Sequence, residues 1–282
     1  MFKILEKKEL SPGVFRMVID APRIAKKTQP GQFIIERVDE ESERIPLTVA
    51  DFDREKGTIT LIFQAVGAST ELLAEKKEGE SILNLVGPLG KPSEVAEGIG
   101  TVVCIGGGIG VAPVYPIARA MKEAGNKVIS IMGARSKEIL IMEDEMRAVS
   151  DETIVTTDDG TYGIKGFVTT ALGQLVERGE KIDRVYAIGP VVMMKSVADA
   201  TRPLALPTVV SLNPVMVDGT GMCGGCRVQV GTETKFACVD GPEFDGHLVD
   251  FNALRTRQGM YRDMEAEAEK EHKCRIGLGR DS

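Results

Sequence analysis

The chain has 282 residues, of which 43% are hydrophobic and 27% are charged, and its formal net charge is −7. This length predicts two or three compact units. The acidic balance offers no basic surface, so nucleic acid is not expected as a partner. No stretch reaches the length of a membrane span and the N-terminus lacks the apolar core of a signal peptide, so we expect a cytoplasmic protein with no membrane partner.

Residues 1–97 alternate short β-type runs with turn signals such as Ser11-Pro12-Gly13. This pattern predicts a small antiparallel β-barrel domain. One helix is expected from Ser69 to Lys77, with Ser69 or Thr70 as its N-cap. The predicted strands are Val14–Ile19, Phe33–Val38, Leu47–Ala50, Thr58–Phe63 and Ile82–Val86.

Residues 98–208 change to strand–helix alternation, which predicts a doubly wound parallel α/β domain. The expected strands are Thr101–Ile105, Lys127–Met132, Ile154–Thr156 and Arg184–Ile188, and a helix is expected over Ala112–Ala124. The glycine-rich turn Gly106–Gly110 follows the first strand, where close backbone approach and a helix N-terminus suit a pyrophosphate. Such turns also arise from packing alone. Gly189-Pro190, at the end of another strand, favours the ligand-binding interpretation.

Residues 209–250 contain the spacing Asp218-x4-Cys223-x2-Cys226-x11-Cys238. It matches a [2Fe–2S] loop whose first cysteine is replaced by aspartate. Thiolates are the soft ligands that such clusters select, and the glycines of the loop bring amide groups close to the sulfides. A zinc site with the three cysteines plus Asp218 or His247 is the alternative. Five cysteines without a secretion signal argue against a disulfide, and Cys104 is expected in the core.

Three further motifs have both a functional and a simpler interpretation. Arg44-Ile45-Pro46-Leu47-Thr48 suits a phosphate and the polar edge of a flat ring, or is a surface arginine beside an edge strand. Gly67-Ala68-Ser69-Thr70 is a possible anion cradle, or a helix cap. Asp158 lies in a turn sequence, where its carboxylate would also suit the hydroxyls of an adenosine ribose.

Taken in order, the motifs resemble the ferredoxin-NADP reductase superfamily over about residues 1 to 205. With the cluster loop, the chain is similar to the electron-transfer flavoproteins that include dihydroorotate dehydrogenase electron-transfer subunits. The aspartate at the first ligand position departs from the four cysteines of those subunits. The aspartate and the charged tail look more like the small (alpha) subunits of NADH-dependent reduced ferredoxin:NADP oxidoreductases, also described as sulfide dehydrogenase small subunits. The motifs are 44–48, 67–70, 87–90, 106–113, 133–135, 157–160 and 189–190.

The resemblance implies three cofactors: FAD in the barrel, NAD(H) in the α/β domain and a [2Fe–2S] cluster. It implies FAD contacts from Arg44, Pro46, Leu47, Thr48, Gly67, Ser69 and Thr70. It implies NAD(H) contacts from Gly106, Gly107, Gly108, Gly110, Pro113, Asp158, Gly189 and Pro190. It implies cluster ligands at Asp218, Cys223, Cys226 and Cys238. No catalytic acid or base is expected, because hydride transfer depends chiefly on stacking two rings and excluding water.

The expected function is therefore that of an NAD(H)-linked oxidoreductase subunit. It would move a hydride between NAD(H) and FAD, and single electrons between FAD and the cluster. The resemblance implies a heterodimer with a larger flavoprotein that carries FAD and [4Fe–4S] clusters and performs electron bifurcation, with ferredoxin and NADP(H) reached through that partner. The alternatives are the electron-transfer subunit of an NAD-linked dihydroorotate dehydrogenase and a nonenzymatic, zinc-stabilised interaction module.

Residues 251–282 form a strongly charged C-terminal segment. We expect a helix over Phe251–His272 followed by a polar tail that contains Cys274. The apolar residues of this helix are sparse for a core element. Phe251, Leu254, Tyr261 and Met264 are therefore predicted to form a narrow stripe that docks on a partner subunit.

Overall fold

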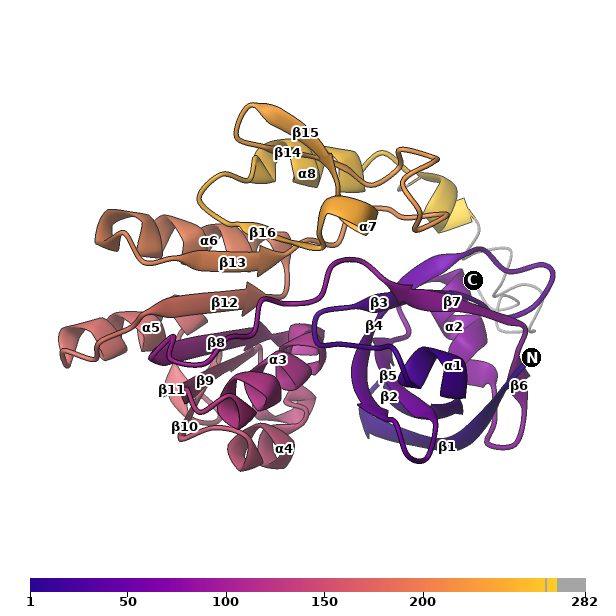
Figure 1. Cartoon of the computed structure of the whole chain (residues 1–282), viewed down its shortest axis with the longest axis horizontal. Coiled ribbons are helices and arrows are strands. Elements are labelled where there is room, and N and C mark those ends of the chain that lie inside the picture. Colours follow the sequence, from indigo (N-terminus) through magenta and orange to yellow (C-terminus); the bar gives the residue numbers. More distant parts are fainter. Residues whose placement is uncertain (262, 268–282) are drawn as a thin grey trace.

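The computed structural model describes residues 1–261 and 263–267, which form two seven-stranded sheets and a smaller unit above their junction in the view of Figure 1. The barrel lies on one side of the molecule and the parallel sheet with its helices on the other. The segment from β14 to α8 lies against both. Among the described residues, no helix is long and apolar enough to cross a membrane.

The barrel domain contains the first seven strands, which are antiparallel and follow the order β6-β1-β2-β5-β4-β3-β7. Its two edge strands, β6 and β7, follow one another in sequence, so the sheet nearly closes on itself. The inward side chains form one core, in which Met17, Ile34 and Leu61 are fully buried. The strands are β1 (Phe2–Ser11), β2 (Val14–Asp20), β3 (Phe33–Arg37), β4 (Ile45–Asp53), β5 (Thr58–Gln64), β6 (Ser81–Ile82) and β7 (Asn84–Leu89).

The second sheet has the order β11-β10-β9-β8-β12-β13-β16. Its strands are parallel except β16, which pairs antiparallel with β13 at the edge. The chain runs outward from β8 in both directions, so the order reverses between β8 and β12. The strands are β8 (Thr101–Gly107), β9 (Lys127–Ala134), β10 (Glu152–Thr157), β11 (Ile164–Lys165), β12 (Arg184–Ile188), β13 (Thr208–Ser211) and β16 (Glu243–Asp245).

Helices cover both faces of this sheet, as the predicted doubly wound fold requires. Helices α3 and α4 pack on one face, and α5 and α6 pack on the other. Cys104 is fully buried under α3, which confirms its predicted place in the core. The helices are α1 (Pro22–Ala25), α2 (Ala68–Glu75), α3 (Val111–Glu123), α4 (Glu143–Ala148), α5 (Val168–Glu177), α6 (Val191–Thr201), α7 (Ala237–Asp240) and α8 (Phe251–Gln258).

The cluster unit is joined to the α/β domain by strand pairing and by a shared apolar core, in addition to the chain connection. It contains a hairpin of β14 (Arg227–Val230) and β15 (Glu233–Phe236), followed by α7. Strand β13 crosses the predicted boundary between residues 208 and 209, and β16 from the cluster unit completes the parallel sheet. Cys226 and Cys238 belong to the same apolar core as strands β8 and β12.

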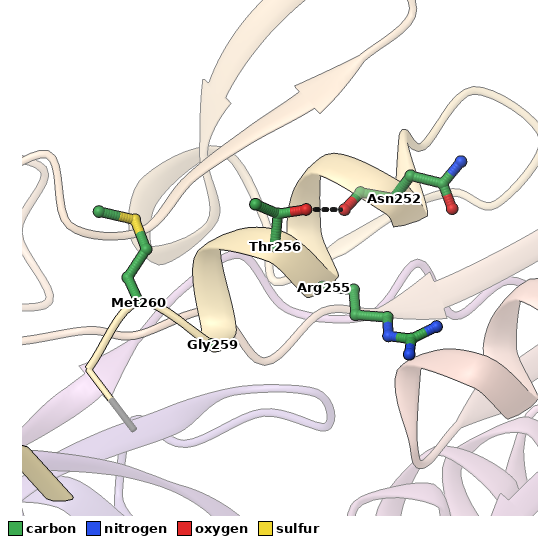
Figure 2. A pocket seen from close by; sticks show the side chains of 5 residues that line it. All are labelled: Asn252, Arg255, Thr256, Gly259 and Met260. Atoms are coloured by element: carbon green, nitrogen blue, oxygen red, sulfur yellow. Dashed lines mark hydrogen bonds between the residues drawn. The ribbon is translucent and has the colours of Figure 1, made fainter. Parts of the chain in front are cut away.

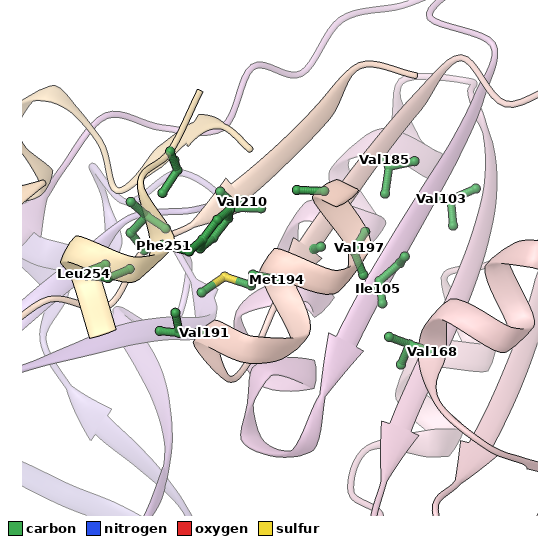
Figure 3. Close-up of a cluster of buried hydrophobic side chains, with 14 of the residues drawn as sticks. Val103, Ile105, Val168, Val185, Val191, Met194, Val197, Val210, Phe251 and Leu254 are labelled. Carbon is green, nitrogen blue, oxygen red and sulfur yellow. The ribbon is translucent and has the colours of Figure 1, made fainter. Parts of the chain in front are cut away.

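The structure contradicts half of the predicted docking stripe of the C-terminal helix, because Tyr261 and Met264 are 46% and 67% exposed but the other two residues are buried. Phe251 and Leu254 are 6% and 1% exposed and pack inside this chain, beside Met194 of α6 and Val210 of β13 (Figure 3). Two apolar residues three positions apart are enough to anchor α8 in the core, because the helix lies between α6 and the β14 hairpin of the cluster unit. Helix α8 ends at Gln258, a turn follows over residues 259–261, and residues 263–267 are helical again. The predicted helix is therefore found in two pieces, and its remainder to His272 and the tail with Cys274 lie outside the described residues.

Candidate cofactor sites

The glycine turns of the α/β domain meet at the carboxyl ends of β8 and β12. These strands are parallel neighbours, with Ile188 paired to Gly106. A Cβ atom on Gly110 would lie 2.2 Å from the Ile188 carbonyl oxygen, and one on Gly107 would lie 2.3 Å from Met193 Sδ. Packing therefore requires glycine at position 110, whereas a side chain at position 107 would require the flexible Met193 side chain to move. The junction is also the point where strand order reverses, which is where open α/β sheets bind ligands.

Gly108 differs from its neighbours in this turn. It has a φ of +55°, in the left-handed region, and a Cβ atom there would meet nothing within 4 Å. Its backbone therefore faces open space at the start of α3, with Pro113 in the first turn of that helix. This is the place in the turn where a ligand phosphate can approach the main chain closely. Pro190 caps the start of α6 across the same junction.

Asp158 follows β10 at the same edge of the sheet. Its amide donates to the Ala134 carbonyl oxygen at 3.1 Å, and its side chain is exposed. The neighbouring Asp159 is committed to the turn, because its carboxylate accepts from the Thr161 amide at 2.9 Å and the Thr161 hydroxyl at 2.7 Å. Two strand spacings, about 10 Å, separate β10 from β8. That separation suits one nucleotide extended along the edge.

The predicted flavin residues lie at one end of the barrel. Strands β4 and β5 are antiparallel, so the start of β4, next to Arg44, lies beside the end of β5, which leads into α2. Pro46, Leu47 and Thr48 are half-buried, and Arg44 is exposed immediately before them. Leu47 packs against the barrel core. The two sequence motifs therefore lie beyond the same end of the β4–β5 pairing.

The N-cap of α2 is Gly67, so the predicted N-cap at Ser69 or Thr70 is wrong; Thr70, at the third helical position, instead bonds back to the N-cap backbone. Its Oγ1 accepts from the amides of Val66 and Gly67 at 3.0 and 3.2 Å and donates to the Gly67 carbonyl oxygen at 3.0 Å. The first intrahelical bond, from the Glu71 amide to Gly67, is 2.9 Å long. The amide of Ser69 lies before that bond and is available to an anion.

The cysteine loop brings two of its thiols together, whereas the carboxylate of Asp218 is held by backbone amides of the loop. Cys226 and Cys238 are buried, with their Sγ atoms 3.2 Å apart. Burial, together with the contact to Cys226, raises the pKa of the Cys238 thiol to about 12. Asp218 accepts from the amides of Thr220 and Cys223, each at 2.6 Å. These bonds, the Thr220 amide first, lower the pKa of Asp218 to about 2, so its carboxylate is ionised.

The donor chemistry of the loop fits an iron–sulfur cluster. The Gly225 amide donates to Cys223 Sγ and the Cys238 amide to Cys226 Sγ, both at 3.4 Å, which are the bonds that stabilise cluster thiolates. Within residues 1–261 and 263–267, no three His, Cys, Asp or Glu side chains already form a metal-binding group. His247 Nε2 lies 2.9 Å from Thr201 Oγ1, and this contact favours Asp218 over His247 as the fourth donor.

The cysteine loop lies on the outer face of the barrel. A Cβ atom on Gly219 would come within 2.8 Å of Ile35 Cγ1 and 2.6 Å of Leu89 Cδ1. Ile35 is on β3, next to Pro46 of β4 in register. The loop that holds the cysteines and the strand that holds the flavin motif are thus one strand apart.

The sequence analysis missed two carboxylates whose pKa values are raised in the fold. Glu36 is fully buried on β3, and burial, with the charge of Asp39, raises its pKa to about 8. The sequence did indicate that Glu36 points inward, because the residues two positions before and after it are apolar and face the barrel core. Glu243 of β16 accepts a 2.5 Å bond from Ser93 Oγ, and burial raises its pKa to about 7.

Two concave regions lie outside the predicted cofactor residues. One, of about 370 Å³, borders α8 and contains Arg255, Thr256 and Met260 (Figure 2). The other, of about 470 Å³, lies between the barrel and α3 and contains Asp51 and Arg119, which form a 2.7 Å ion pair. Both are open and largely polar, so neither resembles an enclosed ligand pocket.

Comparison with known proteins identifies two domains. Residues 104–199 match the oxidoreductase NAD-binding domain, and residues 213–250 match the iron–sulfur cluster binding domain of dihydroorotate dehydrogenase B. A Thermotoga maritima protein described as a homolog of the dihydroorotate dehydrogenase B (NAD(+)) electron transfer subunit is 49% identical over 263 residues, 93% of this chain and 92% of that protein. The electron transfer subunit of Bacillus cereus is 32% identical over 251 residues, 86% and 94% of the two chains.

A solved structure is similar along nearly the whole chain. It belongs to a study of flavin-based electron bifurcation in NADH-dependent reduced ferredoxin-NADP oxidoreductase. The identity is 47%, the TM-score is 0.91, and the alignment covers 96% of this chain and 97% of that one.

These findings confirm the predicted fold class and the predicted cofactor types. The chain is an oxidoreductase subunit of the electron-transfer type, with FAD, an iron–sulfur cluster and NAD(H) as its cofactors. Its relatives are named as subunits, so they work with a further chain. The chain belongs to the family of dihydroorotate dehydrogenase B electron transfer subunits and their homologues, within the ferredoxin-NADP reductase superfamily.

Proposed function

We propose that this chain is the small subunit of an electron-bifurcating NADH-dependent reduced ferredoxin:NADP oxidoreductase. The likeness to a chain of such an enzyme, 47% identity with a TM-score of 0.91, carries the proposal. Asp218 supports it, because an aspartate stands where the all-cysteine spacing has its first thiolate. The proposed partner is a larger flavoprotein subunit with FAD and [4Fe–4S] clusters, through which ferredoxin and NADP(H) are reached.

The proposed cofactor contacts follow the geometry described above. Arg44, Pro46, Leu47 and Thr48 would hold FAD together with Gly67, Ser69 and Thr70, and the cysteine loop would hold a [2Fe–2S] cluster through Asp218, Cys223, Cys226 and Cys238. When bound, FAD converts the two-electron chemistry of the nicotinamide into the one-electron chemistry of a cluster.

The protein's own contribution is placement and the exclusion of water. Nicotinamide nucleotide would lie along the sheet edge, from the open backbone of Gly108, across Gly189 and Pro190, to Asp158. The buried contact of Gly219 with Ile35 keeps solvent out from between the cysteine loop and the flavin strand. This arrangement requires no acid or base, because hydride transfer moves no separate proton.

Asp158 makes NAD(H) the proposed nucleotide. An exposed carboxylate at the sheet edge accepts ribose hydroxyls and repels a 2′-phosphate. Rapid-mixing reduction of the flavin should be faster with NADH than with NADPH at equal concentration. Asp158→Asn should narrow that preference, whereas Asp144→Asn, an exposed aspartate of α4, should leave it unchanged. Faster reduction of the unmodified protein by NADPH would refute the assignment.

Anaerobic purification of the native complex tests the function as a whole. We expect a larger flavoprotein to copurify, with its own FAD and [4Fe–4S] clusters, and NADP⁺ to be reduced only when NADH and reduced ferredoxin are both supplied. The second candidate function rests on the match of residues 213–250 to the dihydroorotate dehydrogenase B cluster domain. A complex that oxidises dihydroorotate with NAD⁺ would replace the first proposal with that one. The free cysteines of the described chain suit a reducing compartment, and we propose the cytoplasm.

A further inference from the structure

Helix α8 lies beyond the part of the chain that matches the cluster domain, which ends at residue 250. Asp250 caps its start by accepting from the amides of Asn252 and Ala253 at 3.0 and 2.9 Å. The buried side chains of Phe251 and Leu254 then fix the helix against α6 of the α/β domain (Figure 3). The helix is therefore held rigidly from its first turn.

The last turn of α8 contacts both ends of the loop that carries the first two proposed ligands, Asp218 and Cys223. An Arg257 guanidinium nitrogen donates to the Gly225 carbonyl oxygen at 3.1 Å, between Cys223 and Cys226. The Gln258 side-chain amide donates to the Asn213 carbonyl oxygen at 2.8 Å and to Asn213 Oδ1 at 3.0 Å. Two consecutive residues thus bracket the loop over residues 213–225.

Within residues 1–261 and 263–267, the Arg257 guanidinium forms no salt bridge with a carboxylate. The side chain is half-buried, and its Nε atom is buried without a hydrogen-bond partner in the part of the chain that the structure describes. A desolvated cation needs a negative group nearby. An iron–sulfur cluster with anionic ligands on the adjoining loop is net negative and would supply that charge.

We propose that Arg257 is a positioning residue for the cluster and that its charge raises the cluster's midpoint potential. The inference rests on the cluster assignment in the proposed function. Uptake of one electron adds one negative charge to the cluster, and a fixed guanidinium stabilises that reduced state. As a general scale, one unit charge about 10 Å from a redox centre, at an effective dielectric constant near 20, shifts a one-electron equilibrium about tenfold.

Substitutions within α8 test the proposal on the full chain loaded with FAD and cluster. Arg257→Gln removes the charge at the loop. Arg255→Gln removes the same charge from the exposed side of the helix, beside the concave region of Figure 2, and is the matched control. Arg257→Lys keeps the charge. The readout is the midpoint potential, from a reductive titration followed by electron paramagnetic resonance.

We expect Arg257→Gln to lower the ratio of reduced to oxidised cluster about tenfold at the unmodified midpoint, which is a shift of about 59 mV. Arg255→Gln should change the ratio less than about twofold, because solvent screens its charge, and Arg257→Lys should restore most of the shift. Equal shifts in Arg257→Gln and Arg255→Gln, or none in either, would overturn the proposal.

A loss of the cluster would also be informative. If Arg257→Gln keeps FAD and loses iron while Arg255→Gln keeps both, the positioning role is supported, and retention of the cluster in Arg257→Lys would show that the charge at this position holds it. If Arg257→Gln loses FAD as well, the helix has a general structural role and the proposal fails. The absence of any cluster signal from the unmodified protein would instead contradict the proposed function.

Discussion

Glu36 is expected to make the barrel less stable as the pH rises. Its side chain is fully buried on β3, among the inward residues of the barrel core, and its two carboxylate oxygens have no hydrogen-bond partner within the described residues. Desolvation, reinforced by the charge of Asp39, raises its pKa from 4.5 to about 8. The carboxyl is therefore neutral in the folded chain at pH 7 and ionised in the unfolded chain.

The sign and size of the effect follow from this difference. Because the folded state binds the proton more tightly, the stabilisation is complete below the unfolded pKa of 4.5 and is lost as the pH rises through about 8. At about 1.4 kcal/mol for each pH unit, the loss across this window is about 5 kcal/mol. That figure is an upper limit, since local opening of the barrel would solvate the carboxylate.

Urea unfolding of the FAD-loaded protein, followed by flavin fluorescence at pH 5 and pH 8, measures this loss. Glu36→Gln keeps the shape of the side chain and removes its titration, so the variant should lose much less stability between the two pH values. Glu43→Gln, at an exposed glutamate of the following loop, controls for the change of charge. Equal losses in the unmodified protein and in Glu36→Gln would refute the reasoning.

Three other changes have expected outcomes. Arg119→Met breaks the 2.7 Å ion pair with Asp51 between the barrel and α3. Urea titrations should show that the free energy of unfolding falls by at most about 1 kcal/mol, and by less in high salt. Gly110→Ala places a Cβ atom 2.2 Å from a backbone oxygen, so it should cost about 1–3 kcal/mol of stability and raise the NADH concentration needed to reduce the flavin. Removal of iron followed by mild oxidation should join Cys226 to Cys238, whose Sγ atoms are 3.2 Å apart, as peptide mass mapping under nonreducing conditions would show.

The sequence predicted elements whose pattern is local and missed those that depend on distant pairing. Strand Arg184–Ile188 was predicted with the bounds that the structure shows, since a continuous apolar run between turn signals specifies a buried strand. Strand β1 was missed because its charged residues face solvent and only Ile4 and Ser11 are buried, so it lacks an apolar alternation. Strand β16 pairs with a strand more than 30 residues earlier, a partner that local periodicity cannot identify.

The candidate sites likewise divide into features that a local sequence pattern predicts and features that depend on distant parts of the chain. The glycine turns were placed correctly at strand carboxyl ends, because parallel strands direct these ends to one edge; the sequence did not predict that the two strands are neighbours. The cysteine spacing identified the loop. The roles of Glu36 and Arg257 were not predicted, because each depends on what folds around it: one carboxylate is enclosed by a barrel, and one guanidinium reaches a loop some 30 residues earlier in the chain.

The pairing of β13 with β16 has a consequence for how this protein can be divided. If the cysteine-bearing segment were cut away, β13 would become an uncovered sheet edge with free backbone donors and acceptors, which invites association between molecules. The segment itself would lose the strand that anchors it. Fragments made by cutting after β13 should therefore tend to aggregate, and neither piece could be exchanged between proteins as a self-contained cassette.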